Sequence, residues 1–137
     1  MNKSDSILLV EDDHIDILAV KRALKEIEAT NPLSVVNNGE EALDFLRNKS
    51  NEKPAIVLLD LNMPKMNGIE FLRVVKQDCE LKSIPVVVLT TSREEQDRID
   101  SFSLSVAGYM VKPISYVQFA EVLKTIHGYW MLSEVPT

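Results

Sequence analysis

The chain has 137 residues, of which 45% are hydrophobic, and this is the size and composition of one ordinary globular domain. Its 15 basic and 21 acidic side chains give a net charge of −6, and because Lys and Arg are scattered, the sequence supports neither nucleic-acid binding nor a membrane-surface role. No apolar run approaches the roughly 18 residues of a membrane span, and the first six residues, MNKSDS, lack the apolar core of a secretion signal, so we expect a cytoplasmic domain.

Strand patterns and helix patterns alternate along the chain. A short apolar run predicts a buried strand, whereas apolar residues three or four positions apart predict one face of a helix. In chain order the patterns predict a strand at 7–10, a helix at 17–27, a strand at 33–36, a helix at 40–47, a strand at 55–59, a helix at 69–79, a strand at 84–90, a helix at 94–105, a strand at 107–111 and a helix at 116–126. We expect residues 1–137 to form one domain, with a short extension past the last helix at about 128–137.

Individual residues suggest how some of these elements begin and pack. Asp13 and Asp16 could be the N-cap and the N3 partner of the first helix, because Asp is favoured at both positions. The single cysteine, Cys79, can form neither an internal disulfide nor a metal cluster, and its spacing places it on the inner face of the third helix. We therefore expect a buried core thiol.

Five strands that alternate with five helices predict an α/β fold, a (βα)5 doubly wound domain with a parallel sheet and helices on both faces. Ligands of such sheets bind outside the carboxyl ends of the strands. The groups at those ends are Glu11–Asp13, Asp60, Thr90–Ser92 and Lys112–Pro113. We expect acids, a hydroxyl group and an amine to meet at one mouth.

Carboxylates that converge on one mouth require a cation between them. Two like charges about 4 Å apart repel by roughly 4 kcal/mol at an effective dielectric constant near 20. Oxygen ligands suit Mg²⁺, and beside such an ion Asp60 could act as an oxygen nucleophile, as carboxylates do in aspartyl-phosphate enzymes. A transferred phosphoryl group also needs a fixed hydroxyl group and a mobile cation, and Thr90 and Lys112 meet those needs.

Four motifs give the chain a family resemblance. LLVEDD, LLDLNMPKMNG, VVVLTTS and GYMVKP, in this order, resemble the receiver domain of bacterial two-component response regulators. The resemblance runs through all five strands. It implies a flavodoxin-like sheet of order 2-1-3-4-5, and a stand-alone regulator that is no enzyme beyond catalysing its own phosphorylation and dephosphorylation.

The resemblance also implies roles for single residues. The phosphoacceptor would be Asp60; the Mg²⁺ ligands Glu11, Asp12, Asp60 and the backbone carbonyl of Asn62, with Asp12 the direct ligand of the acidic pair; the phosphoryl-binding and switch residues Thr90, Tyr109 and Lys112; and the structural residues Gly68 and Pro113. Lys112 would bind a phosphate oxygen ahead of a cis bond to Pro113. From position alone, Tyr109 could equally be a half-buried strand aromatic, and Gly68 could simply shape a loop.

Partners follow from the same resemblance. The donor would be a histidine kinase or a phosphotransfer protein, and phosphorylation would shift the face formed by the fourth helix, fifth strand and fifth helix, residues 94–127. LLVEDDHIDILAVKRAL, DCELKSIPVVVLTTS and the tail GYWMLSEVP are most similar to stand-alone receivers that partner phytochrome-type kinases, which also makes a homodimer plausible.

Other functions fit the same residues less well. A haloacid-dehalogenase phosphatase needs a second Asp two residues after its nucleophile, where this chain has Asn62. A nucleotide or flavin domain needs a glycine-rich turn after the first strand, and VEDDHID has no glycine. The strongest alternative is a protein-interaction module that works without phosphorylation. Thr91 departs from the small alanine common in the family, and Asn62 and Ser92 are expected beside the path of the hydrolytic water.

Overall fold

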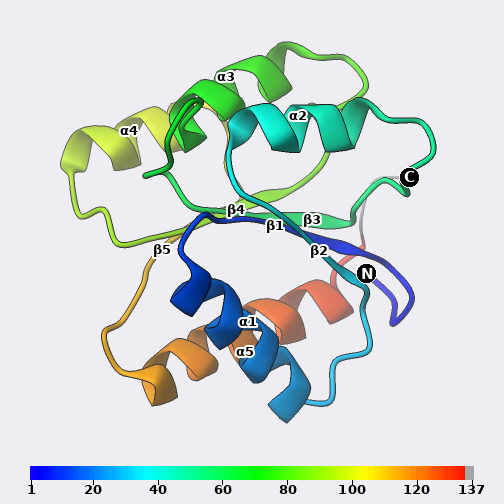
Figure 1. The fold of residues 1–137 in the computed structure, drawn as a ribbon, viewed down its shortest axis with the longest axis vertical. Coiled ribbons are helices and arrows are strands. Elements are labelled where there is room, and N and C mark those ends of the chain that lie inside the picture. The colour runs from blue at the N-terminus through cyan, green and yellow to red at the C-terminus, as the bar shows by residue number, and fades with distance from the viewer. Residues whose placement is uncertain (135–137) are drawn as a thin grey trace.

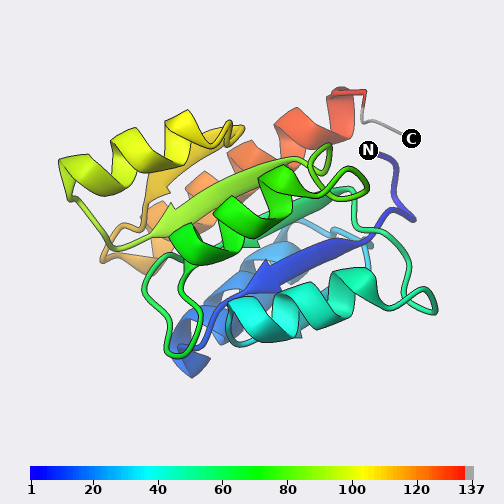
Figure 2. The ribbon, with the colours of Figure 1, turned by 90° about the horizontal axis from the view of Figure 1, so that it is seen from above.

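The computed structural model describes residues 1–134, and its five strands form a single parallel sheet. The strands are β1 Ile7–Val10, β2 Leu33–Val36, β3 Ile56–Leu59, β4 Val86–Thr90 and β5 Gly108–Val111. They are ordered β2-β1-β3-β4-β5, and every neighbouring pair is parallel, so the strand arrows in Figure 2 share one direction. The predicted fold class and strand order are confirmed.

The five helices cover both faces of the sheet. They are α1 His14–Glu26, α2 Gly39–Arg47, α3 Gly68–Gln77, α4 Glu95–Ser103 and α5 Tyr116–Leu132. Figure 1 shows α1 and α5 side by side below the sheet, with α2, α3 and α4 above it. Connections from the strands to α1 and α5 leave at the left of Figure 1, and both termini lie at the right.

Each face of the sheet has its own core. Side chains alternate between the faces of a strand, so neighbouring positions feed different cores. The core under α2 and α3 includes Leu8, Val10, Val57, Leu59, Phe71 and Leu72; the core under α1 and α5 includes Ile7, Leu9, Ile56, Leu58, Phe119 and Leu123. Because both faces are covered, the inner strands are continuous apolar runs rather than alternating ones.

Side-chain caps begin the helices at defined residues. Asp13 is the N-cap of α1, and its carboxylate accepts hydrogen bonds from the backbone N–H groups of Ile15 and Asp16 at 2.9 and 3.1 Å. The N-cap interpretation of Asp13 is confirmed. Asn67 and Glu70 form a reciprocal capping box at the start of α3, and this fixes where the helix begins after the β3 loop.

Cys79 is exposed, so the prediction of a buried core thiol is wrong. The helical period that places it on the inner face holds only to Gln77, where α3 ends. Asp78 is the C-cap, and its carboxylate accepts hydrogen bonds from the backbone N–H groups of Glu80 and Leu81, which turns the chain away from the helix axis. The thiol therefore lies on a surface turn.

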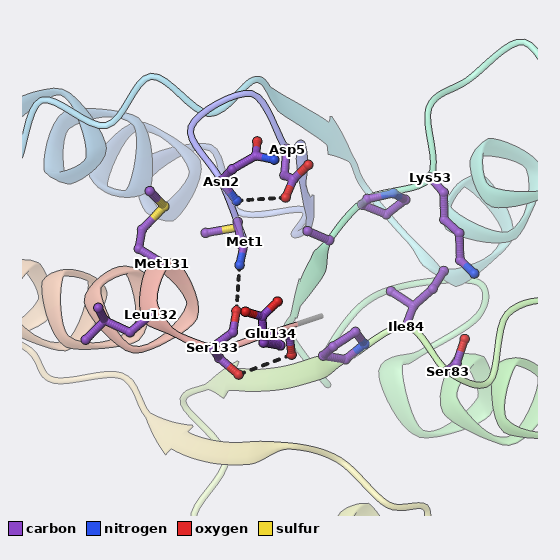
Figure 3. A pocket seen from close by; sticks show the side chains of 13 residues that line it. Met1, Asn2, Asp5, Lys53, Ser83, Ile84, Met131, Leu132, Ser133 and Glu134 are labelled. Carbon is purple, nitrogen blue, oxygen red and sulfur yellow. Dashed lines mark hydrogen bonds between the residues drawn. The ribbon is translucent and has the colours of Figure 1, made fainter. Parts of the chain in front are cut away.

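The last helix is longer than predicted. It runs to Leu132 and includes the first five residues of the expected extension, because Trp130 and Met131 pack against the core under α1 and α5. The rest of the extension begins at Ser133, and residues 135–137 lie outside the described part. The amino group of Met1 donates hydrogen bonds to the carbonyl oxygens of Trp130 and Ser133 at 2.8 and 2.7 Å, and Figure 3 shows the bond to Ser133. The C-terminal end of a helix is a favourable place for a positive charge.

One predicted feature of the backbone is not found. Residues 1–134 contain no cis peptide bond, so the predicted cis bond between Lys112 and Pro113 is wrong. The trans isomer is the more stable form of an X–Pro bond in the absence of compensating contacts.

None of the helices among residues 1–134 has the length and apolarity to cross a membrane.

Candidate functional site

A hollow of about 590 Å³ opens at the carboxyl ends of the strands, where the doubly wound fold places its ligand sites. It lies at the edge where β1 passes into α1 and β5 passes toward α5, on the left of Figure 1. The hollow is lined by Glu11, Asp12, Asp13, His14, Ile15, Asp16, Asp60, Asn62, Thr91 and Lys112. The predicted meeting of acids and an amine at one mouth is therefore observed.

Three carboxylates form a compact cluster inside this mouth. Glu11, Asp12 and Asp60 each offer an oxygen atom within 4.8 Å of the others. Glu11 and Asp60 are buried, whereas Asp12 is exposed to solvent. The Oδ1 atom of Asp60 is buried, and no described residue gives it a hydrogen-bond partner, an arrangement that costs free energy unless a cation or a donor completes it. Carboxylate oxygens are the ligands that hard divalent cations prefer, and one oxygen of this cluster still lacks a partner. The cluster therefore fits a divalent cation such as Mg²⁺.

Lys112 joins the carboxylates from the end of β5. Its ammonium group forms ion pairs with Glu11 and with Asp16, the latter at 2.8 Å, and lies 4.0 Å from Asp60 Oδ1. The Lys112 side chain is 5% exposed. Its backbone N–H donates to the Thr90 carbonyl oxygen at 2.7 Å, so pairing with β4 fixes the backbone position from which the side chain extends.

Burial and neighbouring charges shift the pKa values of Glu11 and Lys112. Burial raises the pKa of Glu11 to about 7; the hydrogen bond and charge of Lys112 oppose that rise, and the charge of Asp60 adds to it. Burial alone would lower the pKa of Lys112, but hydrogen bonds to Asp16 and Glu11 and the charges of Glu11 and Asp60 outweigh it, so its pKa is raised. Lys112 is therefore a permanent cation at neutral pH.

The hydroxyl residues lie behind the mouth. Thr90 is fully buried, and its Oγ1 accepts a hydrogen bond from the backbone N–H of Ser92 at 3.3 Å. Tyr109 is half-buried, and its hydroxyl group donates to the Ser92 carbonyl oxygen at 3.1 Å; burial raises its pKa. The Ser92 hydroxyl group donates to Asp97 at 2.6 Å. Thr91, rather than Thr90 or Ser92, lines the hollow itself.

The loop after Asp60 folds back on the acceptor because of Gly68. The backbone N–H of Gly68 donates to the Leu61 carbonyl oxygen at 3.0 Å. A Cβ atom at position 68 would lie 2.7 Å from the Asp60 carbonyl oxygen and 2.8 Å from Leu61 Cα, a separation that real Cβ atoms essentially never show. Only glycine permits this approach, and the loop then presents Asn62 at the rim of the mouth.

Asp16 is a site residue whose contact is missed by sequence reasoning. As an N3 residue it should reach back to the N-cap, yet its carboxylate binds Lys112. The signal was present in the sequence as an acidic residue in the first turn of the helix that leaves the acidic strand end. Helical spacing gives the face of such a residue but not its partner across the mouth.

A second hollow of about 560 Å³ lies at the opposite edge of the sheet and is drawn in Figure 3. It is lined by segments around Met1, Lys53, Ile84 and Ser133. Its charged side chains come from separate segments. In the described part of the chain, the one group of acidic residues able to hold a metal ion is the cluster at the carboxyl edge, so that edge carries the candidate site.

Comparison with known families agrees with this architecture. The model of the response regulator receiver domain matches residues 7–124, which is most of the chain. The chain therefore belongs to the response regulator receiver domain family, and it is a receiver of two-component signal transduction. Receiver domains are generally signalling modules rather than enzymes.

Individual relatives are similar over nearly their whole length. The response regulator Rcp1 of Synechocystis is 37% identical over 134 residues, covering 95% of this chain and 91% of Rcp1. The probable methanogenesis regulatory protein FilR2 of Methanothrix harundinacea is 37% identical over 128 residues, covering 91% of this chain and 83% of FilR2. Among solved structures, the phosphorylated cyanobacterial phytochrome response regulator RcpA is 37% identical and superposes with a TM-score of 0.92, covering 98% of this chain and 99% of RcpA. A Mn²⁺-bound form of Rcp1 gives 0.91 at 36% identity, covering 97% of this chain and 99% of Rcp1.

Proposed function

We propose that this protein is a stand-alone response regulator in which Asp60 accepts a phosphoryl group from a phosphohistidine, with Mg²⁺ bound at the mouth. One observation carries the proposal. The buried Oδ1 of Asp60 lacks a hydrogen-bond partner and lies among two further carboxylates and an ammonium group at the carboxyl edge of the sheet. An acceptor oxygen left without a partner is available as a nucleophile.

Each residue of the mouth has a defined task in this reaction. The metal ion would be held by Glu11, Asp12, Asp60 and the backbone carbonyl of Asn62, and when bound it would neutralise charge on the phosphoryl oxygens. A carboxylate oxygen of Asp60 forms the new O–P bond as the N–P bond of the donor histidine breaks, and the imidazole leaves with the electron pair of that bond. Lys112 supplies an ammonium group to a phosphoryl oxygen. Thr90 would supply its hydroxyl group once its segment moves toward the mouth.

The response would leave through the face of α4, β5 and α5. Helix α4 is weakly anchored, because Ser101 is its one buried residue while Ile99 and Phe102 are 51% and 56% exposed. The Tyr109 hydroxyl group ties β5 to the segment that precedes α4. Movement of Thr90 would therefore reach Tyr109 and α4 together, with a coupling of about 1 to 3 kcal/mol typical of allosteric proteins.

The proposed donor is a histidine kinase or phosphotransfer protein, and the likeness to RcpA supports a phytochrome-type kinase. Ile15 is 77% exposed beside the mouth, and Ile114, two residues after Lys112, is fully exposed. Apolar residues placed around an acceptor suit a partner that must seat its phosphohistidine there. A homodimer, the cytoplasmic location and the absence of DNA binding remain predictions.

The test is intact mass after incubation with acetyl phosphate, with and without Mg²⁺. We expect one added phosphoryl group in the wild-type protein, and none in Asp60→Asn or after removal of the metal ion. An adduct that persists in Asp60→Asn would contradict the assigned acceptor. If a known receiver is labelled under the same conditions and this protein is not, and a panel of phosphorylated kinases also fails to label it, a phosphorylation-independent interaction module becomes the better description.

A further inference from the structure

Lys112 is held by carboxylates other than the proposed acceptor. An ammonium group has three N–H donors and no acceptor. One donor is directed to Glu11 and one to Asp16, at 2.8 Å for Asp16, while Asp60 Oδ1 at 4.0 Å is beyond hydrogen-bond distance. The Oδ1 atom of Asp60 therefore has no hydrogen-bond donor among residues 1–134, although an ammonium group lies close to it.

Asp16 is fixed in place by the helix that carries it. Its backbone N–H donates to the N-cap carboxylate of Asp13 at 3.1 Å, and its side chain lies in the first turn of α1, where the helix dipole favours a negative charge. The Asp16 side chain is 31% exposed, so solvent weakens its ion pair without removing it. The carboxylate is thus an anchored acceptor at the α1 side of the mouth.

The two partners of Lys112 differ in what a bound cation would do to them. Glu11 belongs to the acidic cluster that fits Mg²⁺, so its carboxylate would be shared with the metal ion. Asp16 lies outside that cluster. With a metal ion bound at the mouth, Asp16 would remain as the carboxylate that pairs with Lys112 alone.

We propose that Asp16 is a positioning residue, which holds the Lys112 ammonium group at the α1 side of the mouth and competes for it with a phosphoryl group on Asp60. This inference rests on the proposed function. Asp16 touches neither the acceptor nor the metal cluster, and it acts through Lys112. Loss of the Asp16 carboxylate would release the ammonium group of Lys112 toward the phosphoryl oxygens and so favour the state in which Asp60 carries a phosphoryl group.

The experiment measures the binding of beryllium fluoride, a non-covalent mimic of a phosphoryl group, at saturating Mg²⁺ by NMR. We expect Asp16→Asn to bind this probe about 3- to 10-fold more tightly than the wild-type protein, the range for losing one partly exposed, charge-assisted competitor. The matched control is Asp13→Asn. Asp13 lines the same mouth but does not touch Lys112, and Asn caps a helix as well as Asp does. We expect this control to bind the probe within about twofold of wild type, because the Asp13 carboxylate is exposed to solvent and forms no ion pair with Lys112 among the described residues.

Introducing Asp16→Asn into a Lys112→Gln background separates an effect through Lys112 from a general charge effect. We expect no gain in that background. The inference is overturned if Asp16→Asn binds the probe as the wild-type protein does, if Asp13→Asn gives the same gain, or if the gain persists without Lys112. A wild-type protein that binds Mg²⁺ but not beryllium fluoride would instead overturn the proposed function, and the inference with it.

Discussion

Replacing Gly68 by alanine should impair the acceptor specifically, because the new methyl group would meet the backbone of Asp60 itself. The Cβ atom would lie 2.7 Å from the Asp60 carbonyl oxygen, whereas ordinary contact begins at 3.4 Å, so this carbonyl would have to retreat by about 0.7 Å. Backbone at the end of a central strand cannot rotate away as a side chain can. The strain must therefore be absorbed by the loop that positions the acceptor.

The expected loss of stability follows from the size of this overlap. Overpacking of this kind costs about 1 to 3 kcal/mol, and alanine returns up to about 1 kcal/mol by restricting the unfolded chain. We expect a net loss of roughly 1 to 2 kcal/mol in the free energy of unfolding, measured by urea denaturation. A 1 Å misplacement of a reacting group can cost about 100-fold in rate, so a shift of this size should slow labelling of Asp60 by acetyl phosphate about tenfold or more.

Gly39→Ala is the matched control for this prediction. Its Cβ atom would meet Met66 Cγ at 2.6 Å, Met66 Sδ at 2.9 Å and Met66 Cβ at 3.0 Å. The Cγ and Sδ atoms can move to another rotamer, which leaves a shift of a few tenths of an ångström to be made at Cβ. We expect labelling of Asp60 to stay within about twofold of wild type. If Gly68→Ala is labelled at the wild-type rate, or if Gly39→Ala is slowed as much, the close approach of Gly68 does not position the acceptor.

Three further predictions concern stability. Gly128 is exposed within α5 with open space around its Cα, so Gly128→Ala should raise the free energy of unfolding by about 0.5 to 1 kcal/mol, and an unchanged melting temperature would contradict this. Asp13→Ala should cost about 1 kcal/mol in urea denaturation by removing the N-cap of α1, whereas Asp13→Asn should cost almost nothing. Burial lowers the pKa of His127 below 6.5, so its stabilising effect is fully present above pH 6.5 and is lost as the pH falls toward the folded value, because the unfolded chain binds a proton that the folded protein resists. His127→Gln should make unfolding less pH-dependent across that window, as measured by urea denaturation at several pH values, and an unchanged pH dependence would contradict this.

The type and order of the elements could be predicted because two different periods are written into the sequence. Strands buried on both faces are continuous apolar runs, as at residues 86–89 of β4, and the helices repeat their apolar residues every three or four positions. Helix ends were less predictable. The apolar period points past Gln77 to Cys79, but the capping carboxylate of Asp78 ends α3 first, and packing by Trp130 carries α5 beyond its expected end.

The place of the candidate site could also be predicted, since a parallel sheet brings all its carboxyl ends to one edge. Glu11, Asp12 and Asp60 do lie together with Lys112, as the strand ends predict. The depth of each side chain is not written in the order of the strands. Thr90 belongs to the same edge, yet it is fully buried behind Thr91, because the strand continues through it and pairs with β5.

The partner of Lys112 depends on a charge balance that no linear pattern records. Five carboxylates line the mouth, and Lys112 is the one lysine or arginine among the lining residues that the structure describes. With every carboxylate ionised, the mouth carries four more negative charges than positive ones, and a divalent cation would still leave two. A phosphoryl group bound to Asp60 adds negative charge to this excess, and the ammonium group nearest to it already binds Glu11 and Asp16, so the phosphoryl oxygens compete with these two carboxylates for it. The resting pairing of Lys112 with Asp16 is therefore part of the energetics of phosphorylation, and helical spacing alone reveals neither the pairing nor its consequence.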